Sequence, residues 1–188
     1  MNIVVLYSEV MGYTQGILEA LAHLKPEVQV HVVYWDKRKL SAYSLDEGKS
    51  VKYYPRSSFD VNRLKQFLLD KMPPVIFVSG WMDKEYLSAI KWFKKNNKTR
   101  VVSGIDDQFH GRIRQYLGMI VSRVYYKRIF DYMWVSGMPQ YHYASLMGYK
   151  MNTIVSNLYS ANSQLFSQNP TLAGGWYIWA DFPPRKGL

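Results

Sequence analysis

Short apolar runs and longer amphipathic segments alternate along the whole chain. The first run, Asn2–Tyr7, is almost continuously apolar, which is typical of a strand covered on both faces. The segments between such runs repeat apolar residues every three or four positions, as the buried face of a helix does. The expected strands are 2–7, 28–35, 51–54, 75–78, 100–104, 132–135 and 152–155. Helices are expected to begin near Thr14, Asp60, Asp83, Ile113 and Pro139, with Thr14 and Asp60 as the caps of the first two.

This alternation predicts an α/β fold with a Rossmann-like, doubly wound and mostly parallel sheet. Residues 1–159 form the expected domain. The Ser-, Asn-, Gln- and Gly-rich stretch 160–174 reads as a linker, and 175–188 as the first strand and turn of a second domain. Ligands of such sheets bind at the carboxyl ends of the strands. The loops expected at that edge are Ser8–Tyr13, Ser79–Met82, Ile105–Gly111 and Ser136–Gln140.

The loop after the first strand, SEVMGY, is a candidate anion site. Amides at the start of a helix attract phosphate, and Gly12 beside Tyr13 allows a close approach. Neither G-x-G-x-x-G nor a Walker motif is present, so the loop matches no dinucleotide or P-loop fingerprint. The alternative is that Gly12 only makes a tight strand-to-helix turn.

The densest polar cluster in the chain is GIDDQFHG, residues 104–111. Asp106 or Asp107 could act as a general base, His110 as a base or phosphate partner, and Gln108 as a ligand of sugar hydroxyls. A structural alternative is that one aspartate caps the next helix while His110 is an ordinary surface residue. The spacing of a metal site is missing from this loop, so no metal is expected.

The segment from His110 to Phe130 contains no acidic residue. At helical spacing, Ile113, Leu117, Ile120 and Val124 form a stripe that we expect to face the core. The cations off this stripe indicate either an ordinary solvated face or a helix near an anionic membrane or a phosphorylated acceptor. These cations are Arg112, Arg114, Arg123, Lys127 and Arg128.

The amino-acid composition limits the classes of binding partner that are expected. The net charge is +10 with 16 Tyr and 6 Trp in 188 residues, a balance that suits polyanions: phosphorylated ligands, nucleic acid or an anionic membrane. Cysteine is absent, which excludes disulfides and thiol chemistry. The first residues read as a buried strand and not as a signal peptide, and no apolar run approaches bilayer length. A cytoplasmic protein, with peripheral attachment at the inner membrane face as an option, is the expectation.

The last third of the chain resembles the N-terminal domain of GT-B glycosyltransferases of the family 4 type. The stretch VSGMPQYHYASLMGY, 135–149, is similar to the strand and glycine-terminated helix of that family. NTIVSNLYSANSQLF, 152–166, is similar to the strand, Asn-containing turn and Phe that follow it. WYIWADFPPRKGL, 176–188, is similar to the start of the second domain and includes the Pro-x-Lys-Gly turn. Ala180-Asp181 stands where Gly-Arg is usual.

The resemblance implies transfer of a sugar from a nucleotide-sugar donor to a glycan or lipid-linked acceptor, with retention at the anomeric carbon and without a metal. It also implies that this chain is the acceptor-binding part of the enzyme and is inactive alone. No cofactor is expected besides the nucleotide sugar as co-substrate, and nucleic acid is not an expected partner. The alternative is a non-catalytic Rossmann-like module that binds a nucleotide or another polyanion. We assign His110 and Asp107 as catalytic, Asp106, Gln108 and Arg112 as acceptor-binding, and Gly12, Tyr13 and Lys186 as donor-phosphate-binding.

Overall fold

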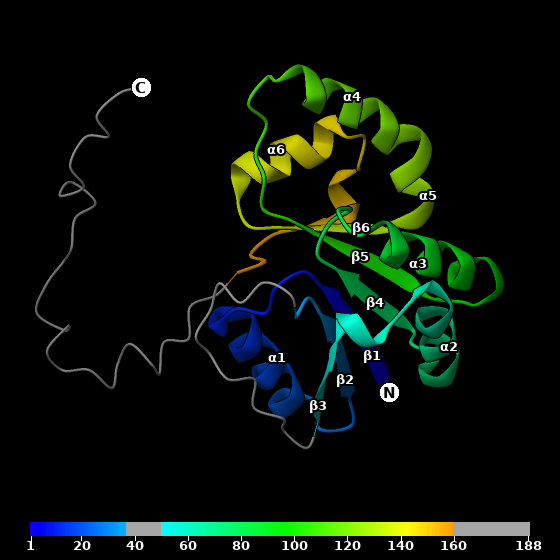
Figure 1. Cartoon of the computed structure of the whole chain (residues 1–188). Helices are drawn as coiled ribbons and strands as arrows, with labels where there is room; N and C mark the ends of the chain where they lie inside the picture. The colour runs from blue at the N-terminus through cyan, green and yellow to red at the C-terminus, as the bar shows by residue number, and fades with distance from the viewer. Residues whose placement is uncertain (37–49, 160–188) are drawn as a thin grey trace, which may run out of the picture.

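A single parallel sheet organises the protein (Figure 1). The structure is a computed structural model that describes residues 1–36 and 50–159. Within these residues the sheet has seven strands in the order β3-β2-β1-β4-β5-β6-β7, and every neighbouring pair is parallel. The strands are β1 (Asn2–Tyr7), β2 (Gln29–Tyr34), β3 (Val51–Pro55), β4 (Val75–Val78), β5 (Arg100–Ile105), β6 (Tyr132–Val135) and β7 (Ile154–Val155).

Helices cover both faces of the sheet, with α1 on one side and α2 and α3 on the other (Figure 1). The predicted doubly wound α/β sheet is therefore confirmed. Its strand order reverses between β1 and β4, which is where ligands of such sheets bind. The helices are α1 (Gly12–Leu24), α2 (Val61–Lys71), α3 (Lys84–Asn96), α4 (Ile113–Val121), α5 (Lys127–Ile129) and α6 (Met138–Leu146), and a π-helical turn, η2 (Ser122–Tyr126), joins α4 to α5.

Strand β1 shows why its run of apolar residues was continuous. Val4 and Leu6 pack with α2 and α3 in the larger core cluster, whereas Val5 and Tyr7 pack with Leu18 of α1 in a second cluster. Successive side chains of a strand point to opposite faces, so a strand covered on both sides needs apolar residues at every position.

Side-chain caps are present at Asp60 and Asp83, two of the expected helix starts, but not at Thr14. Asp60 accepts hydrogen bonds from the amides of Asn62 and Arg63 at 2.9 and 2.8 Å. Asp83 accepts from the amides of Glu85 and Tyr86 at 2.9 and 3.0 Å. The expectation that Thr14 caps α1 is wrong, because the helix begins at Gly12 after Met11 and has no side-chain cap.

The expected core stripe of the fourth helix is also wrong. Ile113, Leu117, Ile120 and Val124 are all exposed, and the side of the helix that faces the protein carries buried Gln115 and Ser122 instead. The helix forms where the periodicity predicted it, but its apolar side is turned outward. Among the described residues, no helix has the length and apolar character needed to cross a membrane.

Buried His31 on β2 makes stability depend on pH. Burial, and secondarily Lys71 and Lys52, lower its pKa from 6.5 to about 4, while its Nδ1 lies 3.1 Å from the Tyr54 hydroxyl. The unfolded chain takes up this proton near pH 6.5 and the folded chain only near pH 4. Lowering the pH from about 6.5 to about 4 should therefore lower the free energy of unfolding by about 2 kcal/mol. This is less than the limiting slope of about 1.4 kcal/mol per pH unit would give, because the slope is reached only between the two pKa values and solvent screens part of the effect.

Urea unfolding of the wild type and of His31→Gln at neutral pH and near pH 4 tests this prediction. The variant should lose less stability than the wild type over the interval, because glutamine does not titrate. Carboxylates that also protonate near pH 4 affect both proteins equally. An equal loss in both proteins would contradict the assignment.

Candidate functional site

The four predicted loops do meet at the carboxyl edge of the sheet. The loops after β1 and β4 are joined directly, because the Ser8 amide donates to the Ser79 hydroxyl at 2.8 Å. The loops after β5 and β6 are joined by the Gln140 side chain, which donates to the Asp106 carbonyl at 3.0 Å. The first pair of loops flanks the point at which the strand order reverses, so the edge has the geometry of a ligand site.

Tyr159 connects the two halves of this edge. Its ring packs edge-on against Tyr13 in the first turn of α1, with centroids 5.0 Å apart, and its hydroxyl donates to Asp106 Oδ2 at 3.2 Å. Burial, and then the nearby Tyr7 and Asp106, raise the pKa of Tyr159 far above its usual value. The phenol therefore stays neutral and remains a hydrogen-bond donor at physiological pH.

The start of α1 remains open to an anion. The helix has no side-chain cap, unlike α2 and α3, so the amides of its first turn, including those of Gly12 and Tyr13, keep their capacity to donate. Burial, and then Tyr7, Asp106 and Glu9, raise the pKa of Tyr13. Thr14 is buried, and its hydroxyl has no hydrogen-bond partner among the described residues.

Hydrogen bonds to the side chain of buried Gln115 fix the backbone of the acidic loop that follows β5. Gln115 Oε1 accepts from the His110 amide at 2.8 Å, and its Nε2 donates to the Gln108 carbonyl at 2.7 Å. Gly111 takes a left-handed conformation with φ +71°, which lets the chain turn into α4. The loop backbone is thus fixed while its polar side chains point away from the core.

Asp107 and His110 lie together on this loop. His110 Nε2 is 3.9 Å from Asp107 Oδ1, and the two side chains are 41 % and 61 % exposed. At this distance the two groups make no direct hydrogen bond, so both can still bond to a substrate hydroxyl. Asp106, Gln108 and Arg112 are exposed beside them.

The structural alternative for the two aspartates is wrong. Helix α4 begins at Ile113 after Arg112, and neither Asp106 nor Asp107 bonds to its first amides. Capping therefore does not account for this pair of carboxylates. Lys186, predicted to contact donor phosphate, lies outside the described residues.

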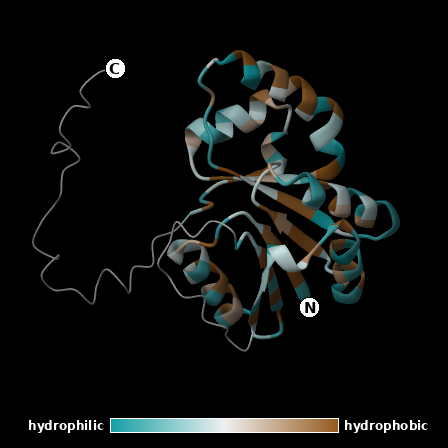
Figure 2. Ribbon diagram, in the orientation of Figure 1, coloured by the Kyte–Doolittle hydropathy of each residue, from teal (hydrophilic) through white to brown (hydrophobic). Residues whose placement is uncertain are grey.

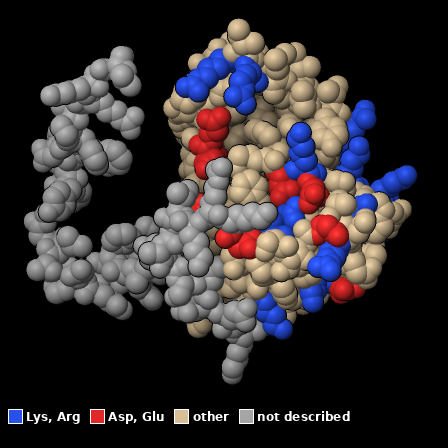
Figure 3. All heavy atoms as spheres, viewed as in Figure 1, with Lys and Arg blue, Asp and Glu red and all other residues tan. Residues whose placement is uncertain are grey.

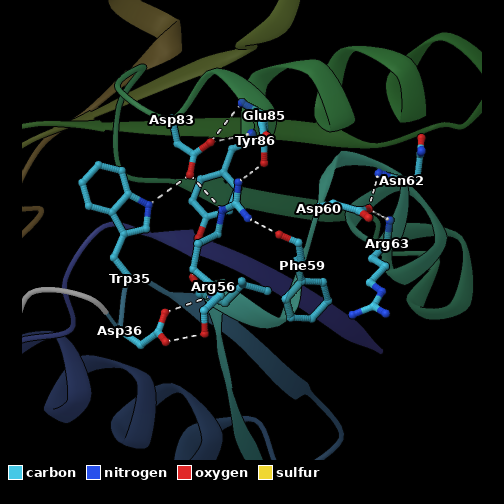
Figure 4. Close-up of polar contacts among 12 residues, drawn as sticks. Trp35, Asp36, Arg56, Phe59, Asp60, Asn62, Arg63, Asp83, Glu85 and Tyr86 are labelled. Atoms are coloured by element: carbon cyan, nitrogen blue, oxygen red, sulfur yellow. Dashed lines mark hydrogen bonds and ion pairs between the residues drawn. The ribbon is translucent and has the colours of Figure 1, made fainter.

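A second polar cluster at the same edge serves the fold (Figure 4). Arg56, after β3, donates from Nε to Asp83 Oδ2 at 2.9 Å and also bonds to Glu85 and to the Phe59 carbonyl. Trp35 Nε1 donates to the same Asp83 oxygen at 3.0 Å. The donors and acceptors of the cluster satisfy one another, so we assign it to anchoring β3 and α3.

An apolar hollow of about 800 Å³ lies between α1 and the face of β4, β5 and β6. Phe77, Val102 and Trp134 line it from the sheet, and Thr14 and Tyr159 also line it. Such a lining offers few hydrogen bonds to sugar hydroxyls, so the polar loops are the better candidate for a sugar site. No group of three or more His, Cys, Asp or Glu residues in the described ranges is arranged to hold a metal.

Sequence reasoning missed the three residues that assemble the site: Gln115, Gln140 and Tyr159. Gln115 had a detectable signal, because it is the third residue of its helix, where a side chain can bond back to the amide of the residue that precedes the helix. Its Oε1 lies 3.4 Å from the Arg112 amide that such a bond would use. Gln140 and Tyr159 carried no local signal, since their partners lie 34 and 53 positions away.

Comparison with known proteins bears on the fold. No protein-family model and no curated protein sequence matches the chain. Among solved structures, L-threonine dehydrogenase from Clostridium difficile matches with a TM-score of 0.50 at 9 % identity, over 72 % of this chain and 53 % of that one. The chain has a Rossmann-like fold. It spans about half the length of that enzyme.

Two further structures match less closely. The Bordetella bronchiseptica enzyme WbmH, solved with NAD+, has a TM-score of 0.48 at 13 % identity, over 72 % of this chain and 55 % of its own. An alpha-glucosyltransferase, solved with UDP-glucose and DNA containing an abasic site, has a TM-score of 0.46 at 14 % identity, over 83 % and 42 %. These two likenesses are too weak to support a fold or a function, and the resemblance to family 4 transferases stays a prediction.

Proposed function

We propose that this chain is the acceptor-side part of a GT-B glycosyltransferase, which moves a sugar from a nucleotide sugar to a glycan or lipid-linked acceptor. One observation carries the proposal. Tyr159 contacts both Tyr13, in the uncapped first turn of α1, and Asp106, in the acidic loop after β5. The predicted phosphate-binding and acceptor-binding residues therefore face a common site.

The two sides of this site suit the two substrates. The open amides at Gly12 and Tyr13 suit the diphosphate of a donor. Carboxylate, amide and imidazole groups at Asp106, Gln108 and His110 suit the hydroxyls of a sugar acceptor. Arg112, at the start of α4, is placed to bind a phosphate on a lipid-linked acceptor.

The reaction has a simple balance. The bond between the anomeric carbon and the donor phosphate breaks, and the nucleoside diphosphate leaves with the bonding electrons. The acceptor oxygen forms the new bond on the same face of the sugar, which retains the anomeric configuration. In our assignment the acceptor proton passes to Asp107 or His110, whose side chains are exposed and face one another.

A non-catalytic module for a nucleotide or polyanion is the second candidate, and the net charge of +10 favours it. This candidate predicts salt-sensitive binding of oligonucleotides and no turnover of nucleotide sugars. The proposed transferase predicts turnover of a nucleotide sugar and no binding of oligonucleotides. Both candidates can therefore be tested with nucleotide sugars and oligonucleotides in one set of experiments.

The test uses the complete gene product containing this chain, incubated with UDP-, GDP- and dTDP-linked sugars. Release of the nucleoside diphosphate is measured, since transferases hydrolyse their donors slowly in the absence of acceptor. We expect one nucleotide class to support release, and the Asp107→Asn variant to release it more slowly. Binding of oligonucleotides without release from any donor would overturn the proposal in favour of the binding module.

A further inference from the structure

The outward side of α4 and η2 is an aliphatic stripe in contact with solvent. Ile113, Leu117, Ile120 and Val124 are 79 %, 58 %, 62 % and 58 % exposed. Their spacing of four, three and four positions places them in one row along the helix. We refer to these four residues as the α4 stripe.

The helix is fixed in this orientation by its inner side. Gln115 is bonded to the loop before the helix, and Gly118 lies against the Tyr143 hydroxyl of α6, where an added Cβ would be 3.8 Å away. Arg123 donates to the Leu146 carbonyl at 3.1 Å. A rotation that buried the α4 stripe would break these contacts and place Gln115 and Ser122 in water.

Cations border the stripe on both sides. Helical spacing places Arg114 and Arg128 along one side, and Arg112 and Lys127 along the other, whereas Arg123 bonds to the Leu146 carbonyl on the inner side. No acidic residue occurs from His110 to Phe130. Figure 3 shows Lys and Arg side chains gathered at the top of the molecule, over the beginning of α4. In Figure 2, brown and teal segments alternate along this helix, which is remote from the sheet.

Tyr116 and Tyr125 are exposed beside the α4 stripe. Tyr116 is 50 % and Tyr125 38 % exposed, and Lys91 Nζ lies 5.1 Å from the Tyr125 ring centroid. Tyrosine suits the depth of lipid headgroups, because its ring is apolar and its hydroxyl is polar.

We propose that the α4 stripe and its bordering cations dock this protein on an anionic phospholipid surface, with α4 lying in the plane of the interface. Aliphatic side chains between rows of Arg and Lys match acyl chains beneath anionic headgroups. Nucleic acid fits less well, because Ile, Leu and Val offer no flat face on which bases can stack. The docking surface contains only described residues, and the proposal does not depend on the proposed transfer reaction.

Vesicle flotation tests the proposal, with phosphatidylcholine alone and with phosphatidylcholine mixed with phosphatidylglycerol. The wild type should float with the anionic vesicles, weaken as salt rises, and bind the neutral vesicles poorly. Leu117→Gln with Ile120→Gln, and separately Arg114→Gln with Arg128→Gln, should each lower the partition coefficient by about tenfold or more. These residues are exposed, so the variants should keep the wild-type unfolding curve.

Matched controls come from exposed residues elsewhere. Leu24→Gln with Met151→Gln removes apolar side chains that are even more exposed than Leu117 and Ile120, and Lys25→Gln with Lys150→Gln removes two charges. Both control pairs should bind as the wild type does. Failure of the wild type to float, or equal losses in controls and α4 variants, would overturn the proposal.

The absence of cysteine allows a second readout at a single labelled site. An environment-sensitive fluorophore on Val124→Cys should shift to the blue with anionic vesicles, whereas the same label on Leu24→Cys should not. A shift that instead follows protein concentration in the absence of lipid, with a change in mass by light scattering, would show that a second copy covers the stripe and would refute membrane docking.

Discussion

Replacing His110 by alanine is expected to lower sugar transfer by about a hundredfold, in keeping with loss of a positioned acid or base. The imidazole lies 3.9 Å from Asp107 and is exposed at the carboxyl edge of the sheet. Asp107→Ala should have an effect of the same order, because the two groups share the acceptor side. Steady-state kinetics of the complete gene product, with the donor identified by nucleotide release, measures both effects.

His23→Ala is the matched control for this prediction. His23 is exposed near the end of α1, far along the helix from the open amides of its first turn. It should leave the transfer rate unchanged. All three variants should unfold at the wild-type urea concentration, since none of these side chains is buried. Unchanged transfer in both His110→Ala and Asp107→Ala would show that the site assignment is wrong.

Arg56→Met is expected to lower the free energy of unfolding by about 3 to 5 kcal/mol, because it leaves a partly buried carboxylate without its cation. The Arg56 and Asp83 side chains are only 15 % and 12 % exposed. Burial opposes ionisation of Asp83, but hydrogen bonds from Arg56, the Tyr86 amide and Trp35 outweigh it and hold the Asp83 pKa below its usual value. The Arg56 guanidinium also lies over the Tyr86 ring at 5.1 Å (Figure 4).

Urea unfolding measures this loss, and Arg63→Met is its control. Arg63 lies nearby and donates to the Ser58 carbonyl at 3.2 Å, but it is exposed. Its replacement should cost about 0.5 kcal/mol or less. Equal unfolding midpoints for the two variants would mean that the Arg56 cluster does not anchor β3 and α3.

Local patterns were enough to predict the frame of the protein. The continuous apolar run of β1, the cap at Asp60 and the helix start at Asp83 act within a few residues, and the structure contains them as expected. The alternation of strands and helices then predicts a parallel sheet, because each helix connects two strands that run in the same direction. The division of the chain at 159 and 174 stays a prediction.

The candidate site was predicted as a set of loops but not as an assembled surface. The rule that ligands lie at strand carboxyl ends located Tyr13, Asp106, Asp107 and His110 correctly at one edge. The contacts that join these loops, through Gln140 and Tyr159, connect residues far apart in sequence. No pattern within a single segment carries such information.

The sequence by itself determined the strands, the helices and the carboxyl edge, because hydrophobic period, caps and chain reversals are local properties. Only the tertiary structure decided which side of α4 faces the protein. A period of 3.6 defines a stripe such as Ile113 to Val124, but it does not say whether core, lipid or another surface covers it. Here Gln115 and Arg123 bond inward, so the polar contacts orient the helix and the apolar stripe faces out.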